Sequence, residues 1–209
     1  MVYRRVRTLL VGAAGIAGLI GWGPGIHAVA APGGGGCQLQ GSVNISPGLS
    51  NTSQNFTYNF SGNLSSCQSN VAGSPTSGTV SAGQVYHPAG STLGYQEPAS
   101  TGTGSCGTST TSGTGIIVWA DGTITVVSYT TSGAAAGVAL QGTVAPSITL
   151  PPTASDPPGT APLTVTTNRF AGDGAVGTLI FQPPDPTACS GAGVTTAAIN
   201  GFVGVGSSS

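Results

Sequence analysis

Residues able to perform chemistry are few in this chain of 209 residues. Beyond residue 30 it holds one histidine, His87, one arginine, Arg169, and no lysine, which excludes covalent catalysis through a lysine amine. His87 stands in VYHPAG, directly before a proline, and no Gly-x-Ser-x-Gly motif accompanies it. The sequence therefore predicts no hydrolytic triad, and a secreted hydrolase would have to depend on His87.

The carboxylates are too scattered for acid–base or metal chemistry. A glycosidase needs two facing carboxylates, but Asp121 belongs to an Asp-Gly turn, and Asp156 and Asp185 lie among prolines. Glu97 and Asp173 are distant in sequence, and Asp173 in GDG offers calcium a single carboxylate. No Cys/His spacing predicts zinc. We expect a protein that is not an enzyme, with no catalytic, cofactor-binding or metal-binding residues and no cofactor.

The first thirty residues predict an export signal. Arg4, Arg5 and Arg7 precede the apolar run LLVGAAGIAGLI at Leu9–Ile20, and AVA at residues 28–30 supplies small residues for cleavage. The run is shorter than the ~18–20 residues of a membrane span. We predict a signal peptide at residues 1–30, no transmembrane span in the mature protein, and a location that is secreted, extracellular or associated with the cell envelope. An uncleaved anchor is the alternative.

The chain beyond residue 30 is poor in charge. One arginine stands against five carboxylates, a net charge of −4. Without a basic patch, binding of nucleic acid has no electrostatic basis. Arg169 itself is expected to pair with Asp173 across a turn, or to cap backbone carbonyls, rather than to anchor a ligand.

Four cysteines lie in the exported part: Cys37, Cys67, Cys106 and Cys189. An even number in an oxidising compartment predicts two disulfides. Of the three possible connectivities we favour Cys67–Cys106 with Cys37–Cys189, since the second bond would tie the two ends of the domain together. The main alternative pairs Cys37 with Cys67 across the first hairpin. Each bond should stabilise the fold by roughly 3–5 kcal/mol.

Residues 55–65 alternate with a period of two. The odd positions are all polar, and the even positions are Phe56, Tyr58, Phe60, Gly62 and Leu64. This period predicts a strand with one buried face. The aromatic row, like Trp119, is therefore expected in the core. If exposed, it would instead be a platform for stacking carbohydrate.

The segment GIIVWADGTITVVSY predicts a β-hairpin. Asp121-Gly122 favours a two-residue type I′ turn, which would set Trp119 opposite Ile124. Ile117 and Val126 would share that face of the hairpin. The other face would carry Ile116, Val118 and Val127, so we expect this hairpin to be covered on both sides.

Further strands are expected throughout the chain, and no window after the signal has helical periodicity. They are residues 37–45, Gly78–Val85, Val138–Val144, Leu163–Asn168, Val176–Gln182 and Val194–Val205. The Pro-rich stretch 145–162 predicts a long surface loop. We therefore expect one all-β domain at residues 31–209, an antiparallel β-sandwich or barrel of about 8–10 strands, preceded by a signal peptide helix.

Several segments resemble blocks of an uncharacterised family of small secreted, disulfide-containing, β-rich proteins of actinobacteria. The more specific parts are SPGL, WADGT, FAGD and PDPTAC, and the resemblance spans nearly the whole mature chain. It implies an extracellular β-rich protein with structural cysteines, and it transfers no catalytic residue.

The function expected from these features is that of a secreted, non-catalytic β-module, a structural or binding protein at or outside the cell envelope. The near absence of ionisable groups leaves shape, hydrogen bonding and apolar contact as its means of recognition. The alternative is a carbohydrate- or cell-wall-binding module with exposed aromatic side chains. Its partner would be a cell-wall polysaccharide or another secreted protein.

Overall fold

A computed structural model describes residues 34–206, and the predicted signal peptide lies outside them. The strands are β1 Gly35–Leu49, β2 Gln54–Ser69, β3 Gly78–Ala82, β4 Val85–Tyr86, β5 Tyr95–Gln96, β6 Ser100–Gly104, β7 Thr108–Trp119, β8 Ile124–Ala134, β9 Gly137–Ala145, β10 Ser147–Leu150, β11 Leu163–Thr166, β12 Gly174–Gln182 and β13 Val194–Gly206, with one short 3₁₀ helix, η1, at Ala188–Ser190.

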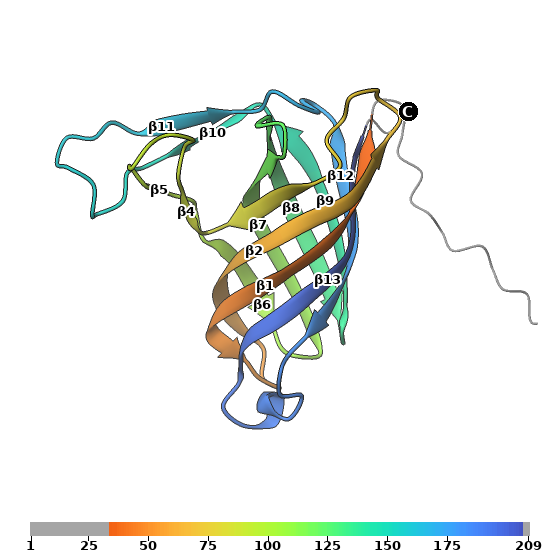
Figure 1. The fold of residues 1–209 in the computed structure, drawn as a ribbon. Coiled ribbons are helices and arrows are strands. Elements are labelled where there is room, and N and C mark those ends of the chain that lie inside the picture. The colour runs from red at the N-terminus through yellow and green to blue at the C-terminus, as the bar shows by residue number, and fades with distance from the viewer. Residues whose placement is uncertain (1–33, 207–209) are drawn as a thin grey trace, which may run out of the picture.

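Most of these strands close into an antiparallel barrel with eight strand positions. Around the barrel the order is β1, β2, then β3 with β6, then β7, β8, β9, β12 and β13, and pairing of β13 with β1 closes it (Figure 1). The predicted all-β fold is confirmed, in its barrel form. We call upper the end where β1 begins and β7 turns into β8, and lower the end that carries η1 and the β8–β9 turn.

One barrel position is shared by two short strands. β3 pairs with the upper half of β2, and β6 with its lower half, and both also pair with β7. The chain leaves the wall after Ala82 and returns at Ser100, and the excursion carries the β4–β5 pair. The predicted strand Gly78–Val85 therefore ends early, at Ala82, because Val85 already belongs to this excursion.

The alternation predicted for β2 matches its burial in the barrel. Phe56 and Leu64 are buried, with Tyr58 and Phe60 packed against the same core. The opposite face is polar, and there Asn44 Nδ2 of β1 donates to Asn59 Oδ1 of β2 at 3.0 Å. The main core is therefore the barrel interior, and the expectation that the aromatic row faces the core is confirmed.

The β7–β8 hairpin differs from its prediction by one residue. Val118, rather than Trp119, lies opposite Ile124. The loop has three residues: the Gly122 N–H donates to the Trp119 carbonyl, and Gly122 takes a φ of 81°. A left-handed glycine at the third loop position is typical of three-residue hairpin loops. The predicted type I′ turn is therefore wrong, because Asp-Gly also fits the longer loop.

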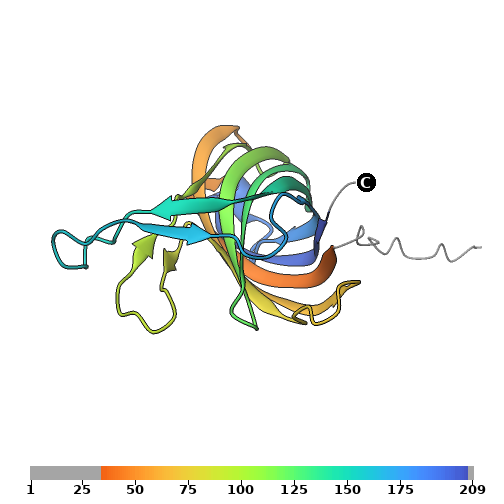
Figure 2. The ribbon, with the colours of Figure 1, turned by 90° about the horizontal axis from the view of Figure 1, so that it is seen from above.

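This shift in register exchanges two neighbouring valines between the faces of β8. Val127 packs in the barrel interior, and Val126 packs outside, against Ile116. The outer face is covered by the β4–β5 and β10–β11 pairs, which project from the side of the barrel (Figure 2). The prediction that the hairpin is covered on both sides is confirmed.

The β10–β11 pair also revises the Pro-rich stretch 145–162. Ser147–Leu150 is a strand that pairs with β11, so only residues 151–162 form the loop. Leu150 is fully buried in the outer core, beside Val165. Apolar residues at alternate positions of this Pro-rich segment thus supply the cover of the barrel wall.

Two disulfides are present, as predicted, but the cysteine pairing that we favoured is wrong. The bonds are Cys37–Cys67 and Cys106–Cys189, with Cα–Cα distances of 4.1 and 6.1 Å. Cys37 and Cys67 lie on the neighbouring strands β1 and β2 near the upper end, as the alternative proposed. Cys106 follows β6 at the lower end, so it meets Cys189 of η1 and is too far along the barrel for Cys67.

Candidate functional site: the barrel lumen

The barrel interior contains a cavity of about 180 Å³. Its lining comes from every strand position of the barrel and contains no Asp, Glu, His, Lys or Arg. The inward side chains that border it are only partly buried although they point away from bulk solvent: Tyr58, Phe60, Val138, Leu140 and Phe181. An apolar, aromatic-lined hollow of this kind is the usual form of a small-molecule site.

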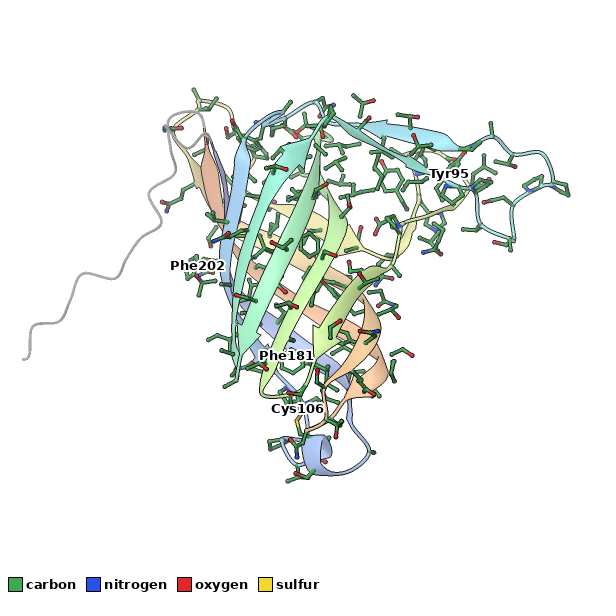
Figure 3. All side chains as sticks on the ribbon, turned by 180° about the vertical axis from the view of Figure 1, so that it is seen from behind. Tyr95, Cys106, Phe181 and Phe202 are labelled. Carbon is green, nitrogen blue, oxygen red and sulfur yellow. A yellow bond between two sulfur atoms is a disulfide. The ribbon has the colours of Figure 1, made fainter. Side chains whose placement is uncertain are left out.

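The cavity reaches the lower end of the barrel. Thr108, the first residue of β7, and Ala135, directly after β8, are exposed and belong to its lining. Phe181 lies near this end and Cys106 at it (Figure 3). The Cys106–Cys189 disulfide holds the neighbouring loops together, and the Cys106 N–H also donates to the Ser50 carbonyl. The loops on this side of the lower end are thus cross-linked to one another.

The upper end is occupied by Trp119. Its side chain is 5% exposed, and its ring meets Phe170 edge-on with centroids 5.8 Å apart. The indole N–H donates to Thr125 Oγ1 at 2.9 Å, and Thr125 donates in turn to the Arg169 carbonyl at 3.0 Å. These contacts fix Trp119 in place, and its apolar ring closes the upper end of the lumen.

A chain of five hydroxyl groups crosses the lower half of the interior. Tyr129 lies 2.8 Å from Ser100 and 3.0 Å from Tyr58, measured between side-chain oxygens. Tyr58 continues to Thr111 at 2.9 Å, and Thr111 to Thr131 at 2.7 Å. All but Ser100 line the cavity. The apolar lumen therefore contains one continuous polar strip.

The strip is neutral. Burial, followed by the nearby Tyr58, raises the pKa of Tyr129 far above its ordinary range. The phenol therefore keeps its proton at every physiological pH. Since the lining holds no ionisable carboxyl or amine group either, the lumen has no fixed charge.

A missing side chain makes room for this strip. Gly113 of β7 points inward, and a Cβ there would collide with Ser100 Oγ and with the Tyr129 hydroxyl. Gly113 pairs with Tyr129 of β8, but on its other side β7 has no partner there, between the end of β3 and the start of β6. The break in the wall and the glycine together let the Ser100 hydroxyl reach Tyr129.

The residues singled out in the sequence for chemistry lie elsewhere. His87 stands next to β4 and its Nδ1 lies 3.1 Å from the Leu93 carbonyl oxygen. Glu97 is 1% exposed and accepts hydrogen bonds from Ser81 Oγ at 2.6 Å and from the Gln84 N–H at 3.1 Å. Within residues 34–206, no three His, Cys, Asp or Glu side chains are close enough to hold a metal ion.

Arg169 is structural, but its predicted partner is wrong. It pairs with Asp121 of the β7–β8 loop at 2.6 Å, instead of with Asp173. Asp121 also accepts hydrogen bonds from the N–H and hydroxyl of Thr123. The ion pair therefore belongs to the closure of the upper end.

The hydroxyl strip was not identified from the sequence. The run TSTTSGTG at residues 108–115 contains only polar residues and glycine, so its threonines resemble those of an ordinary solvated face. Counting inward positions on β7 and β8 would have found Thr111, Tyr129 and Thr131 only with the correct hairpin register. With the predicted turn, which is one residue too short, Tyr129 and Thr131 would lie on the wrong face of β8.

Comparisons of the chain with protein-family models, with curated proteins and with solved structures gave no match. The resemblance to secreted actinobacterial proteins therefore stays a prediction. Among residues 34–206, no helix is long and apolar enough to cross a membrane.

Proposed function

We propose that this protein is an exported, non-catalytic binding protein that holds one small, uncharged, apolar molecule in its barrel lumen. The observation that carries the proposal is the cavity of about 180 Å³ inside the barrel. Eight-stranded barrels have interiors just wide enough to be filled by side chains or to hold one small ligand. Here the side chains leave part of the interior free.

The size of the cavity limits the ligand. An apolar protein cavity of about 150 Å³ stays dry and binds benzene. A cavity of about 180 Å³ suits a molecule of roughly six to nine non-hydrogen atoms. A polysaccharide chain is too large for it.

The absence of charge in the lining supports the same ligand class. Moving an ion from water into an apolar site is very unfavourable unless an opposite charge awaits it. No side chain of the lining could supply that charge. An uncharged ligand loses little on entering, and it gains from burial of its apolar surface at about 25 cal/mol per Å².

Export is part of the proposal. Two disulfides cross-link the described part of the chain, and such bonds persist in oxidising compartments. The basic and apolar pattern of residues 1–30 supports the same location. We therefore propose an extracellular or envelope-associated carrier or sensor of a small apolar compound.

Indene, an uncharged bicyclic hydrocarbon, is a suitable probe for the lumen. We expect the wild-type protein to bind it, as measured by titration with ligand-observed NMR. Leu140→Trp should reduce binding at least tenfold because the larger ring fills the cavity that Leu140 borders. Val138→Phe is a second filling variant if Leu140→Trp does not fold.

Ala139→Trp is the matched control. Ala139 is exposed and neighbours Leu140 on β9, so its side chain points out of the barrel. The same substitution there should leave indene binding unchanged. Wild-type protein that does not bind indene, or equal loss in the two tryptophan variants, would contradict a ligand site in the lumen.

Wall binding is the second candidate, and one surface feature favours it. Phe202 of β13 is 60% exposed, and Val176 and Ile180 of β12 stand beside it on the outer face. Phe202 points away from the barrel (Figure 3). This strip could stack on a sugar ring or contact another secreted protein. Retention of the wild type on peptidoglycan, cellulose or chitin, lost in Phe202→Ser, would support this function.

A further inference from the structure

The five hydroxyls of the strip can be counted as donors. Each hydroxyl has one hydrogen to donate. The four contacts that link Ser100, Tyr129, Tyr58, Thr111 and Thr131 use four hydrogens. One hydrogen of the five is therefore left over. Its position depends on the direction in which the chain of hydrogen bonds runs.

Burial of Ser100 sets this direction. Ser100 is 1% exposed, and within residues 34–206 its hydroxyl makes its side-chain hydrogen bond to Tyr129 alone. If Ser100 accepted that bond, its own hydrogen would be buried without a partner, which costs about 1–3 kcal/mol. If Ser100 donates it, only a lone pair stays unused, which is tolerated more often.

The rest of the chain follows from this first step. Tyr129 accepts from Ser100 and donates to Tyr58, because its single hydrogen has no other acceptor in the strip. Tyr58 then donates to Thr111, and Thr111 to Thr131. The unused hydrogen is that of Thr131. Thr131 lines the cavity and is only partly buried, so its hydroxyl is accessible from the lumen.

We propose that the Thr131 hydroxyl is a hydrogen-bond donor for the ligand, so that the lumen selects small apolar molecules carrying one uncharged acceptor, such as a ketone, an aldehyde or an ether. The proposal rests on the lumen being the ligand site. It goes further because it names the polar group of the ligand and the residue that binds this group. Cooperative polarisation along the chain strengthens the terminal donor.

Two matched pairs of probes test the proposal. Acetophenone and α-methylstyrene have nearly the same shape, and differ by a carbonyl oxygen in place of a methylene group. Indole and indene differ by an N–H donor in place of a methylene group. In a lumen without a donor, acetophenone would bind more weakly than α-methylstyrene because its carbonyl has to leave water. A lumen with a free donor offsets that loss.

We expect the wild type to bind acetophenone at least as tightly as α-methylstyrene, in titrations followed by ligand-observed NMR. In Thr131→Val, which keeps the shape of the side chain, the affinity ratio of acetophenone to α-methylstyrene should fall about tenfold. Indole should gain no comparable preference over indene, since its N–H can use only the spare lone pair of Thr131 and leaves the Thr131 hydrogen without a partner. A preference for indole as large as that for acetophenone would contradict the direction proposed for the chain of hydrogen bonds.

Thr130→Val is the matched control. It also replaces a threonine of β8 by valine, but on the exposed face beside Thr131, outside the cavity lining. The preference for acetophenone should persist in this variant. Equal ratios in the wild type and in Thr131→Val would refute the donor role while leaving the lumen as the binding site. If none of the four probes bound, the proposed function itself would fail, and this inference with it.

Discussion

Arg169 and Asp121 form an ion pair in which Nη2 of the arginine lies 2.6 Å from Oδ2 of the aspartate. The same guanidinium donates through Nε to Thr123 Oγ1 at 2.8 Å and lies over the Phe170 ring. The pair joins the β11–β12 connection to the tip of the β7–β8 hairpin. It therefore holds Phe170 against Trp119 at the upper end of the lumen.

Loss of the Asp121 charge should destabilise the fold in a pH-dependent way. Hydrogen bonds from Thr123, with a smaller contribution from Arg169, hold the pKa of Asp121 below its ordinary 3.8. A lowered pKa in the folded state contributes stability above the unfolded value and loses it as the pH falls. Asp121→Asn should therefore melt below the wild type at pH 7, as followed by circular dichroism. The difference between the two melting temperatures should shrink as the pH falls below 3.8, and an undiminished difference at the lowest pH at which the protein folds would contradict this role.

Ionisation of Glu97 should lower the stability of the fold, whereas ionisation of Asp121 raises it. Burial raises its pKa above the ordinary 4.5, against the hydrogen bonds from Ser81 and Gln84. The folded state then binds the proton more tightly, so the stability is complete below pH 4.5 and declines as the pH rises through the folded pKa. Glu97→Gln cannot ionise. Its melting temperature relative to the wild type should therefore rise between pH 4.5 and 7.5, and a constant difference over that interval would count against a strained buried carboxylate.

The two disulfides should differ in their contribution to stability. Cys106–Cys189 closes a loop with a sequence separation of 83 residues, and Cys37–Cys67 one of 30. In the chain-entropy account these loops correspond to roughly 4–5 and 3–4 kcal/mol. Replacing both cysteines of a pair by alanine should therefore lower the free energy of unfolding more for Cys106/Cys189, as measured in urea. Peptide mapping without reduction checks the pairing, and a peptide joining Cys67 to Cys106 would refute it.

Thr125→Val should be costly although it removes only one hydroxyl. Thr125 is fully buried, accepts from the Trp119 indole and donates to the Arg169 carbonyl. Valine leaves both groups without this partner, at about 1–3 kcal/mol for each group that stays buried and unpaired. We expect a loss of about 2 kcal/mol or more in urea unfolding. Thr130→Val, on the exposed face of the same strand, is the control and should change stability by less than about 0.5 kcal/mol.

Alternation along a strand could be predicted without the structure. The side chains of Phe56, Tyr58 and Phe60 share one face because successive residues of a strand point to opposite sides. The same stereochemistry predicted β9, β12 and β13 nearly to their ends. These are properties of neighbouring residues, so the sequence contains all the information that they need.

The turn of the β7–β8 hairpin was predicted only in part. Asp121-Gly122 correctly located the reversal, but a dipeptide that fits two loop lengths leaves the register open by one residue. The register decides which of Val126 and Val127 faces the lumen. Because it depends on how the whole hairpin packs on both faces, local preference does not choose between the two loops.

Closure of the barrel, and everything inside it, required the tertiary structure. Pairing of β13 with β1 joins the two ends of the described chain, and Tyr58 meets Tyr129 across 71 residues. A linear chain shows which residues are polar, but not which of them share one end of a barrel. For that reason the cystine partners, the partner of Arg169, the free volume of the lumen and the hydroxyl strip emerged only when the strands were assembled in space.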